Sequence, residues 1–554
     1  MSVRGLRIGL LIAVLILLGI GLGTVSGSVS AAPEVPKVNW SACYQEFGPF
    51  ECGIVHVPLD YDNPYEAAIS IALVRLPAGD PSQKIGSLFL NPGGPGGSGV
   101  EFALSVAPYL YTPEVRARFD IVGFDPRGIA RSTALRCFGN PKQWGGYFTP
   151  FSFPITLDQA AIWETADLYL DSACAQRGTK IIDHMDTADV ARDLDMLRRA
   201  VGDEGLTYAG YSYGTFLGVT YANMFPDKVR ALVVDGVLDP IAWTTGALGQ
   251  ENLPFSTRLR SDVGALDALN EFFRLCDTYP VNCAFAPGAE ARFAALAASL
   301  RLEPIVVILP DGTVFTFLYQ DLISNALSAM YYSGSWPSFA EFLLSIESLA
   351  PAATLGENLE AFWTDVGFIT KRGFPHYPNY LEGFPGVACA DSDNPTSYAA
   401  WWDAAQASEA DYGYFGPLWT YVSSICAQWP GLHGDRYTGP FTNWTANPVL
   451  VAGMKHDPAT RYQGAVTVHD LLPNSGLLTV EGWAHCTLMM STEADAAVGA
   501  YLVDPTQLPD GTVFYQDWEP FSTPLSALAE SSAMNARTSL TAITVPETVQ
   551  KNGK

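Results

Sequence analysis

Six short apolar segments, most of them followed by a turn sequence, recur along this chain and set the main limit on its fold. They are residues 87–90, 119–124, 206–209, 230–234, 449–452 and 477–480. Between the second and the third, Val190, Leu194 and Leu197 recur at helical spacing, with Thr187 as the expected N-cap of the helix. Strands that alternate with helices in this way predict an α/β fold with a mostly parallel central sheet.

The alternation stops after Asp239 and resumes at Pro448. The residues between are rich in aromatic side chains, and 261–276 and 337–350 have the pattern of amphipathic helices. We therefore expect a large, mainly helical cap inserted into an α/β core. The expected parts are a signal peptide (1–31), the first part of the core (32–239), the cap (240–447), the C-terminal part of the core (448–524) and a tail (525–554).

The N-terminus has the pattern of an export signal. Arg4 and Arg7 precede an apolar run over 8–22, and Val29-Ser30-Ala31 has the small residues of a cleavage site. The run is short for a membrane span, so we expect a cleaved signal and a secreted protein, with an uncleaved cell-surface anchor as the alternative. No later segment is long and apolar enough to predict a stable membrane partner.

An exported chain can form disulfides, and this one has nine cysteines. Pairing neighbours in the sequence gives four bridges and leaves Cys486 over, next to His485; sequence alone does not fix that connectivity. A thiol nucleophile at Cys486 is disfavoured because adjacent residues rarely face each other. The four expected bridges are 43–52, 137–174, 276–283 and 389–426.

Charge and motifs exclude several classes of function. The formal net charge is −26, which argues against nucleic acid as a partner, because phosphate binding needs clustered Lys and Arg. The chain has no C-x-x-C pair, H-E-x-x-H or G-K-[ST], so we expect neither a metal nor a cofactor. Residues 94–99 match G-x-G-x-x-G, but so glycine-dense a run matches it by chance, and we do not favour dinucleotide binding.

One stretch has the pattern of a nucleophile on a tight turn. Ser212 lies in Gly210-Tyr211-Ser212-Tyr213-Gly214, directly after the apolar segment 206–209 and before a helix-like sequence. Strand, turn and helix in this order are what a nucleophile elbow requires, with small residues two positions before and after the serine. The alternative is an ordinary turn flanked by glycines.

A serine nucleophile needs a base, and the base needs an acid that orients it. His485 follows the last apolar segment on a loop where a base is expected, whereas His456 and His469 are less favoured. Asp457 leaves the preceding segment at its carboxyl end, which gives the order Ser, acid, His of the α/β-hydrolases. Asp235 and Asp239 are the alternative acids.

Two loops are expected to support this site. The glycine-rich residues 91–99 follow an early strand and can offer main-chain N–H groups to a developing oxyanion, with the N–H of Tyr213 as the second donor. Asp125 and Arg127 are expected to pair with each other inside their own loop and to brace the site.

Several motifs resemble those of the secreted tripeptidyl aminopeptidase branch of the proline-iminopeptidase-related α/β-hydrolases. They are LNPGGPGGSG, FDPRGIARS, HMDTADVARDLDMLRRAVG, GYSYGTFLGVTYANMFPDKVRALVVDGVLDP and HDPATRYQGA followed by GWAHC. The resemblance runs from residue 43 to residue 514 and is weakest in the cap. The chain departs from the family pattern in GWAHCT around His485, in DPATRY after Asp457, and in lacking a late cysteine pair.

This resemblance implies an α/β-hydrolase fold and a triad of Ser212, Asp457 and His485, with Gly93 and Gly94 beside the Tyr213 N–H in the oxyanion hole. It also implies an exopeptidase that releases short peptides from a free N-terminus, with Asp391 or Asp393 holding the substrate ammonium. Close relatives include esterases, so a carboxylesterase or lipase-like hydrolase with the same triad is the alternative. A non-enzymatic binding protein on the same scaffold is a third hypothesis, disfavoured by the complete triad pattern.

Overall fold

The computed structural model describes residues 37–308, 314–349, 379–432 and 434–522, which all belong to one compact unit. The expected signal peptide and the tail over 525–554 lie outside these ranges. Within the described ranges, no helix combines the length and the apolar character needed to cross a bilayer.

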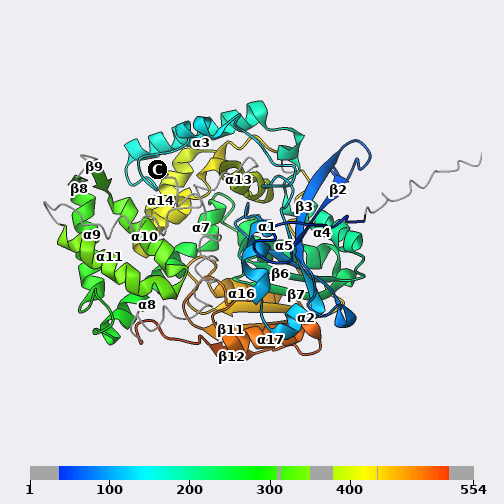
Figure 1. Ribbon diagram of the computed structural model, residues 1–554. Coiled ribbons are helices and arrows are strands. Elements are labelled where there is room, and N and C mark those ends of the chain that lie inside the picture. Colours follow the sequence, from blue (N-terminus) through cyan, green and yellow to red (C-terminus); the bar gives the residue numbers. More distant parts are fainter. Residues whose placement is uncertain (1–36, 309–313, 350–378, 433, 523–554) are drawn as a thin grey trace, which may run out of the picture. The chain divides into compact units, whose positions relative to one another are not determined.

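A sheet of ten strands organises the described residues (Figure 1). Neighbours pair in parallel from β5 to β12, and in antiparallel from β1 to β5. In spatial order the strands are β1 (Ser41–Ala42), β2 (Glu51–Pro58), β3 (Ala68–Leu76), β5 (Phe119–Phe124), β4 (Gly86–Asn91), β6 (Leu206–Tyr211), β7 (Val229–Asp235), β10 (Val449–Met454), β11 (Ser475–Glu481) and β12 (Thr512–Tyr515).

The six apolar segments of the sequence are the six central strands, so the predicted parallel α/β sheet is confirmed. Four of these strands are buried along their whole length (β4, β5, β6 and β10), which is why they read as continuous apolar runs instead of alternating ones. The antiparallel strands β1–β3 at one edge and β12 at the other are additions to the expected core.

Helices cover both faces of the sheet. On one face α4 (Thr187–Val201), α5 (Tyr213–Met224) and α16 (Gln463–Leu471) contribute to one apolar cluster. On the other, α1 (Gly99–Val106), α2 (Pro113–Arg118) and α17 (Thr492–Val503) contribute to a second. Helix α4 is where the sequence predicts a helix, but its N-cap is Asp186, whose side chain accepts the N–H of Asp189; Thr187 is the first helical residue.

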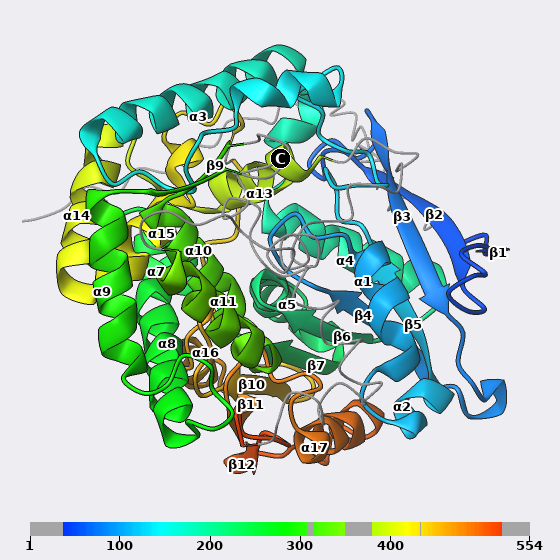
Figure 2. The same ribbon diagram turned by 60° about the vertical axis from the view of Figure 1, so that its left-hand side comes forward.

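The residues between β7 and β10 are mainly helical, as Figure 2 shows. The two amphipathic patterns form α8 (Ser261–Thr278) and α11 (Trp336–Ser348). A hairpin of β8 (Ile305–Ile308) and β9 (Val314–Phe317) interrupts the helices. The other α-helices among the described residues of this segment are α6 (Pro240–Trp243), α7 (Phe255–Leu259), α9 (Ala289–Leu302), α10 (Tyr319–Met330), α13 (Tyr380–Asp391), α14 (Tyr398–Tyr412) and α15 (Gly416–Tyr421).

A long helix from the first part of the chain packs against this insertion. Helix α3 (Leu157–Arg177) lies beside α14 in both views of the chain. The Trp163 indole N–H donates to Ser424 Oγ at 2.8 Å, and that hydroxyl donates to Asp167 at 2.5 Å. Helix α3 is therefore part of the same helical layer, although it precedes β6 in the sequence.

The four disulfides expected from sequence neighbours are all present, which confirms that pairing. Two of them close short loops, with sequence separations of 9 and 7, and two have a separation of 37. Cys486 is a buried free thiol. Each bridge stays within one expected part of the chain, so none of them links the two parts of the core.

Candidate active site

Ser212 lies on a strained turn between β6 and α5. Its φ is 55° and its ψ −126°, a conformation that a residue with a side chain rarely adopts. The turn is tight enough to require the flanking glycines: a Cβ on Gly210 would lie 2.2 Å from the Gly214 carbonyl oxygen, and one on Gly214 would lie 2.6 Å from the Asn91 oxygen. The serine is thus presented at the carboxyl end of the sheet, at the N-terminus of α5.

Asp457 and His485 meet on the loops after β10 and β11. His485 Nδ1 lies 3.0 Å from each carboxylate oxygen of Asp457. An ionised carboxylate only accepts hydrogen bonds, so Nδ1 carries the proton and Nε2 has a free lone pair. This is the tautomer that a general base needs.

Asp457 is held by further donors. It accepts the main-chain N–H groups of Ala459 and Thr460 at 2.8 Å each and that of Cys486 at 3.1 Å. The Thr460 hydroxyl donates at 3.0 Å and also lies 3.3 Å from His485 Nδ1. The sequence analysis did not predict that Thr460 and Cys486 hold Asp457. Their positions, three residues after the predicted acid and next to the predicted base, could have indicated it.

The inserted segment contacts His485 directly. The main-chain N–H of His485 donates to the Tyr331 carbonyl at 2.9 Å, and the Tyr331 ring meets the imidazole edge-on at 5.1 Å between centroids. The His485 side chain is 1% exposed, and its Nε2 has no hydrogen-bond partner among the described residues. Ser212 is also buried, with 9% of its surface exposed.

Ser212 and His485 both lie close to the main chain at Asp235 and Gly236. The Ser212 N–H donates to the Asp235 carbonyl at 3.0 Å. A Cβ on the next residue, Gly236, would lie 3.4 Å from His485 Cε1 and 2.4 Å from Cys486 Sγ. The elbow and the imidazole therefore both lie next to residues 235–236, although no hydrogen bond joins Ser212 Oγ to His485 Nε2 among the described residues.

The alternative acids and bases are occupied elsewhere. Asp235 accepts from the Thr487 N–H and hydroxyl and from the Leu488 N–H, and burial raises its pKa to about 6. Asp239 caps the N-terminus of α6. The two other histidines of this region pair with neighbours of their own, His456 with Asp267 and His469 with Ser475.

The glycine-rich loop after β4 touches the elbow. Gly93 has a φ of 94°, and a Cβ there would lie 2.8 Å from both Ser212 Cβ and the Tyr213 nitrogen. The Gly93 N–H already donates to Asn91 Oδ1 at 2.9 Å. Of the two expected loop donors, Gly94 is therefore the one whose N–H has no partner among the described residues.

The expected pairing of Asp125 with Arg127 is wrong. Arg127 is fully buried and forms ion pairs with Asp189 at 2.9 Å and Asp193 at 2.6 Å, both on α4. Asp125 instead accepts from Ser98 at 2.5 Å and from the Arg131 N–H at 2.9 Å. The carboxylates of α4 that attract Arg127 lie more than sixty residues away in the sequence, so local pattern could not indicate them.

The two candidate amine-binding acids have different surroundings. Asp391 is 1% exposed, and both its oxygens accept hydrogen bonds, from Thr187 and Trp243. Burial, reinforced by the charge of Asp186, raises the pKa of Asp391 to about 7. Asp393 has a side chain that is 47% exposed and pairs with Arg436 at 2.6 Å.

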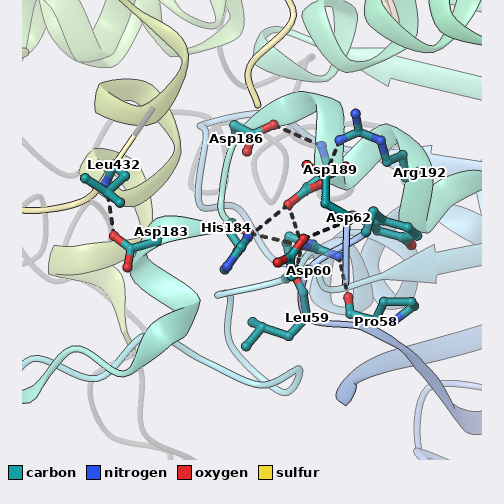
Figure 3. A network of polar contacts seen from close by, with 12 residues as sticks. Pro58, Leu59, Asp60, Asp62, Asp183, His184, Asp186, Asp189, Arg192 and Leu432 are labelled. Carbon is teal, nitrogen blue, oxygen red and sulfur yellow. Dashed lines mark hydrogen bonds and ion pairs between the residues drawn. The ribbon is translucent and has the colours of Figure 1, made fainter. Parts of the chain in front are cut away.

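One group of described residues has the donor set of a metal site. Asp60, His184 and Asp435 each offer a ligand atom, and these atoms lie within 4.8 Å of one another. Figure 3 shows Asp60 and His184 beside Asp189. Both oxygens of Asp60 already accept hydrogen bonds, from the Asp62 N–H and from Asn63. The distance of these residues along the chain explains why no sequence motif indicated the group.

The elbow, the paired Asp457 and His485 and the glycine loop define a serine hydrolase on an α/β-hydrolase fold. Residues 86–265 match the family model described as "alpha/beta hydrolase fold", and residues 412–513 match the model described as "TAP-like protein". The chain belongs to the TAP-like family of α/β hydrolases.

Three relatives illustrate the range of that family. The chain is 31% identical to "Serine protease Hip1" of Mycobacterium tuberculosis, over 90% of this chain and 95% of the relative. It is 30% identical to "Tripeptidyl aminopeptidase" of Streptomyces lividans, over 80% of this chain and 79% of the relative. It is 31% identical to "Carboxylesterase B" of Mycobacterium tuberculosis, over 87% of this chain and 91% of the relative.

Proposed function

We propose that this protein is a serine exopeptidase that releases short peptides from the free N-terminus of peptide substrates. The observation that carries the proposal is the Asp457–His485 pair, with its tautomer fixed, beside a serine on a strained elbow. In this proposal Ser212 is the nucleophile, His485 the base and Asp457 the orienting acid.

The reaction proceeds in two halves. His485 Nε2 takes the Ser212 proton as Oγ attacks the scissile carbonyl, and the N–H groups of Gly94 and Tyr213 stabilise the oxyanion. The imidazolium then gives that proton to the leaving amine, and the acyl group stays on Oγ. A water molecule, deprotonated by His485, attacks the ester and releases the peptide and the serine.

A free N-terminus needs an acceptor for its ammonium group. Asp393 suits this role better than Asp391, because its carboxylate is half exposed whereas both oxygens of Asp391 are buried and bonded. Asp393 also lies at the base of the insertion, where its N–H donates to the Thr244 carbonyl at 2.8 Å. We also propose export, since four disulfides require an oxidising compartment.

A carboxylesterase with the same catalytic groups is the second candidate, because "Carboxylesterase B" is as similar to this chain as the named protease. Mass spectrometry of products from matched free and N-acetylated peptides, with short nitrophenyl esters alongside, separates the two. An exopeptidase yields N-terminal fragments from free peptides and loses most activity on acetylated ones. Cleavage of esters with no cleavage of free peptides would establish the esterase instead.

A further inference from the structure

A buried chain of polar side chains runs from the residue after the nucleophile to the end of helix α13. The Tyr213 hydroxyl lies 2.5 Å from Thr187 Oγ1, and Thr187 Oγ1 lies 2.6 Å from Asp391 Oδ2. The Thr187 N–H donates to Asp391 Oδ1 at 2.7 Å, and the Trp243 indole donates to Oδ2 at 3.2 Å. All four residues are at most 3% exposed.

These side chains come from four different elements. Tyr213 and Thr187 are the first residues of α5 and α4, which pack on the sheet. Trp243 ends α6 and Asp391 ends α13, which both follow β7 in the inserted segment. This series of hydrogen bonds therefore joins the core to the insertion directly behind the elbow.

The hydrogen positions follow from the ionisation of Asp391. An ionised carboxylate accepts only, so the single Thr187 hydroxyl hydrogen goes to Asp391 Oδ2. Thr187 Oγ1 is then an acceptor toward Tyr213, and the Tyr213 O–H must be the donor. In this state every polar hydrogen of these four side chains has an acceptor.

Protonation of Asp391 reverses the direction of the hydrogen bonds that link it through Thr187 to Tyr213. Oδ1 accepts the Thr187 N–H, so the added proton resides on Oδ2 and points to Thr187 Oγ1. The Thr187 hydroxyl hydrogen then turns toward the Tyr213 oxygen, and the Tyr213 O–H loses the acceptor it had. No other acceptor for that hydroxyl lies among the described residues, and a buried donor without a partner is costly.

The groups around Asp391 set where this change occurs. Burial raises its pKa first, and the carboxylate of Asp186 adds to the rise, while the bonds from Thr187 and Trp243 lower it; the resulting pKa is about 7. Arg436 donates to the main-chain carbonyl of Asp391 at 3.5 Å and pairs with the carboxylate of Asp393. Tyr213 itself stays neutral, because burial raises its pKa well above the usual value.

We propose that Asp391 is a positioning residue for the reaction: in its ionised form it holds Tyr213 through Thr187, and so holds the Tyr213 N–H against the oxyanion. The proposal rests on the function proposed above. Tyr213 is the first residue of α5, so no carbonyl of its own helix holds its N–H. The anchored ring is what limits rotation of this residue, and a donor displaced by a fraction of an ångström stabilises the oxyanion less.

The test uses a small nitrophenyl ester, whose turnover does not depend on peptide recognition. Asp391→Asn places an amide NH₂ where Oδ2 lay; it donates to Thr187 Oγ1 as the protonated acid would, and it also leaves the Trp243 indole N–H without its acceptor. We expect Asp391→Asn and Thr187→Val to lower kcat about 10- to 100-fold with KM nearly unchanged. Thr187→Ser keeps the hydroxyl and should restore kcat. The kcat–pH profile of Asp391→Asn should lack the rise through pH 7 that Asp391 contributes.

Matched variants on α5 serve as controls. Thr220→Val removes a buried hydroxyl with no partner among the described residues, and Tyr221→Phe removes a hydroxyl bonded to Asp195. Both should keep kcat. In the double variant Tyr213→Phe/Asp391→Asn, kcat should fall no further than in the more impaired of the two single variants. Both substitutions break the same series of hydrogen bonds.

Three outcomes would overturn the proposal: losses that multiply in the double variant, an unchanged pH profile in Asp391→Asn, or no rescue by Thr187→Ser. If Asp391→Asn does not fold, Thr187→Val against Thr187→Ser and Tyr213→Phe still decide it. Ser212→Ala separates this from the proposed function. Full turnover by Ser212→Ala refutes the nucleophile, whereas an inactive Ser212→Ala with unaltered network variants refutes only the role of Asp391.

Discussion

The main-chain N–H of Cys486 donates to Asp457 Oδ2 at 3.1 Å, so the residue that follows the proposed base holds the carboxylate that orients it. Cys486 has a φ of 70°, which turns its N–H back toward the acid loop. Its thiol lies on the other side, 3.5 Å from the Asp235 carbonyl, and is buried. The backbone of Cys486 thus supports the site, and the sulfur fills space beneath the elbow.

Replacing this cysteine therefore tests whether its sulfur has a chemical role. Cys486→Ala keeps the N–H that Asp457 accepts, so we expect kcat to stay within about threefold of the wild type, with a stability loss of about 1 kcal/mol for the missing sulfur. Burial raises the pKa of the thiol well above its usual value, so it is not a thiolate nucleophile at neutral pH. Steady-state kinetics beside Ser212→Ala measure this, and equal losses in the two variants would restore the thiol hypothesis.

The carboxylate of Asp457 is expected to be essential. Asp457→Asn places an NH₂ among donors and favours the wrong imidazole tautomer, so kcat should fall about 10³- to 10⁴-fold. Asp235→Asn is the matched control, because Asp235 is also a buried carboxylate at the end of a strand, but its oxygens accept from Thr487 and Leu488 instead of from the His485 ring. Its kcat per folded molecule should change less than about tenfold. Similar losses in both variants would mean that Asp457 acts only on stability.

The space beside Ser212 is predicted to be too small for a side chain at Gly93 of the glycine-rich loop. Gly93→Ala puts a methyl group 2.8 Å from Ser212 Cβ and 2.5 Å from the Tyr211 carbonyl oxygen, so the loop must move away. We expect kcat to fall about 10²-fold as the oxyanion donors separate. Gly202→Ala has nearly the same φ, 92°, and nothing within 4 Å of the new Cβ. It carries the backbone strain alone and should keep kcat; an equal loss there would contradict the steric explanation.

The buried guanidinium of Arg127 is predicted to matter for stability and not for chemistry. Arg127→Met leaves the buried carboxylate of Asp193 without its cation and leaves Asp189 with Arg192 as its remaining arginine partner, so it should lower the free energy of unfolding by about 3–5 kcal/mol. Arg118→Met removes a partly exposed pair with Glu114 and should cost about 0.5 kcal/mol or less. Urea unfolding measures both. A normal midpoint with lost turnover would instead indicate a catalytic role for Arg127.

The free energy of unfolding should depend on pH in the way expected for buried acids with raised pKa values. Asp235 and Asp391 have pKa values of about 6 and about 7 in the folded state, against 3.8 ordinarily. Between about pH 4 and pH 7 the folded protein keeps protons that the unfolded chain has lost, so these groups lower the free energy of unfolding as pH rises. Unfolding midpoints from pH 4.5 to 8 should show a weaker fall in Asp235→Asn than in the wild type. An unchanged slope would argue that Asp235 titrates normally.

The sequence predicts the sheet well because its signals are local. Parallel strands that are wholly or mostly buried have sequences that are short apolar runs, and all six of the apolar segments are central strands of the sheet. The elbow was also predictable, since Gly210 and Gly214 flank Ser212 at the spacing that an elbow requires. The contact that requires Gly210 is local, with Gly214, whereas the one that requires Gly214 is with the distant Asn91. Cysteine pairing followed chain proximity, which holds here because each bridge closes a loop inside one expected part of the chain.

The failures concern interactions between distant segments. Arg127 pairs across the sheet edge with α4 instead of within its loop, and a sequence offers no rule for choosing among many acids. The burial of Asp391 could not be read from its acidic neighbours, because it depends on the packing of α4, α6 and α13. Thr187 looked like a cap but is instead the link between Asp391 and Tyr213. The catalytic and amine-binding roles stay predictions until the variants are measured.

The pairing of β7 with β10 joins Leu232 to Val449 across the whole insertion. During synthesis the strand that carries Ser212 is complete long before the strands that deliver Asp457 and His485 exist. Non-local strands pair last and slowly. A nascent or truncated chain therefore holds the proposed nucleophile without its base, and the order of synthesis itself delays hydrolytic activity until the cap and the last strands have been made.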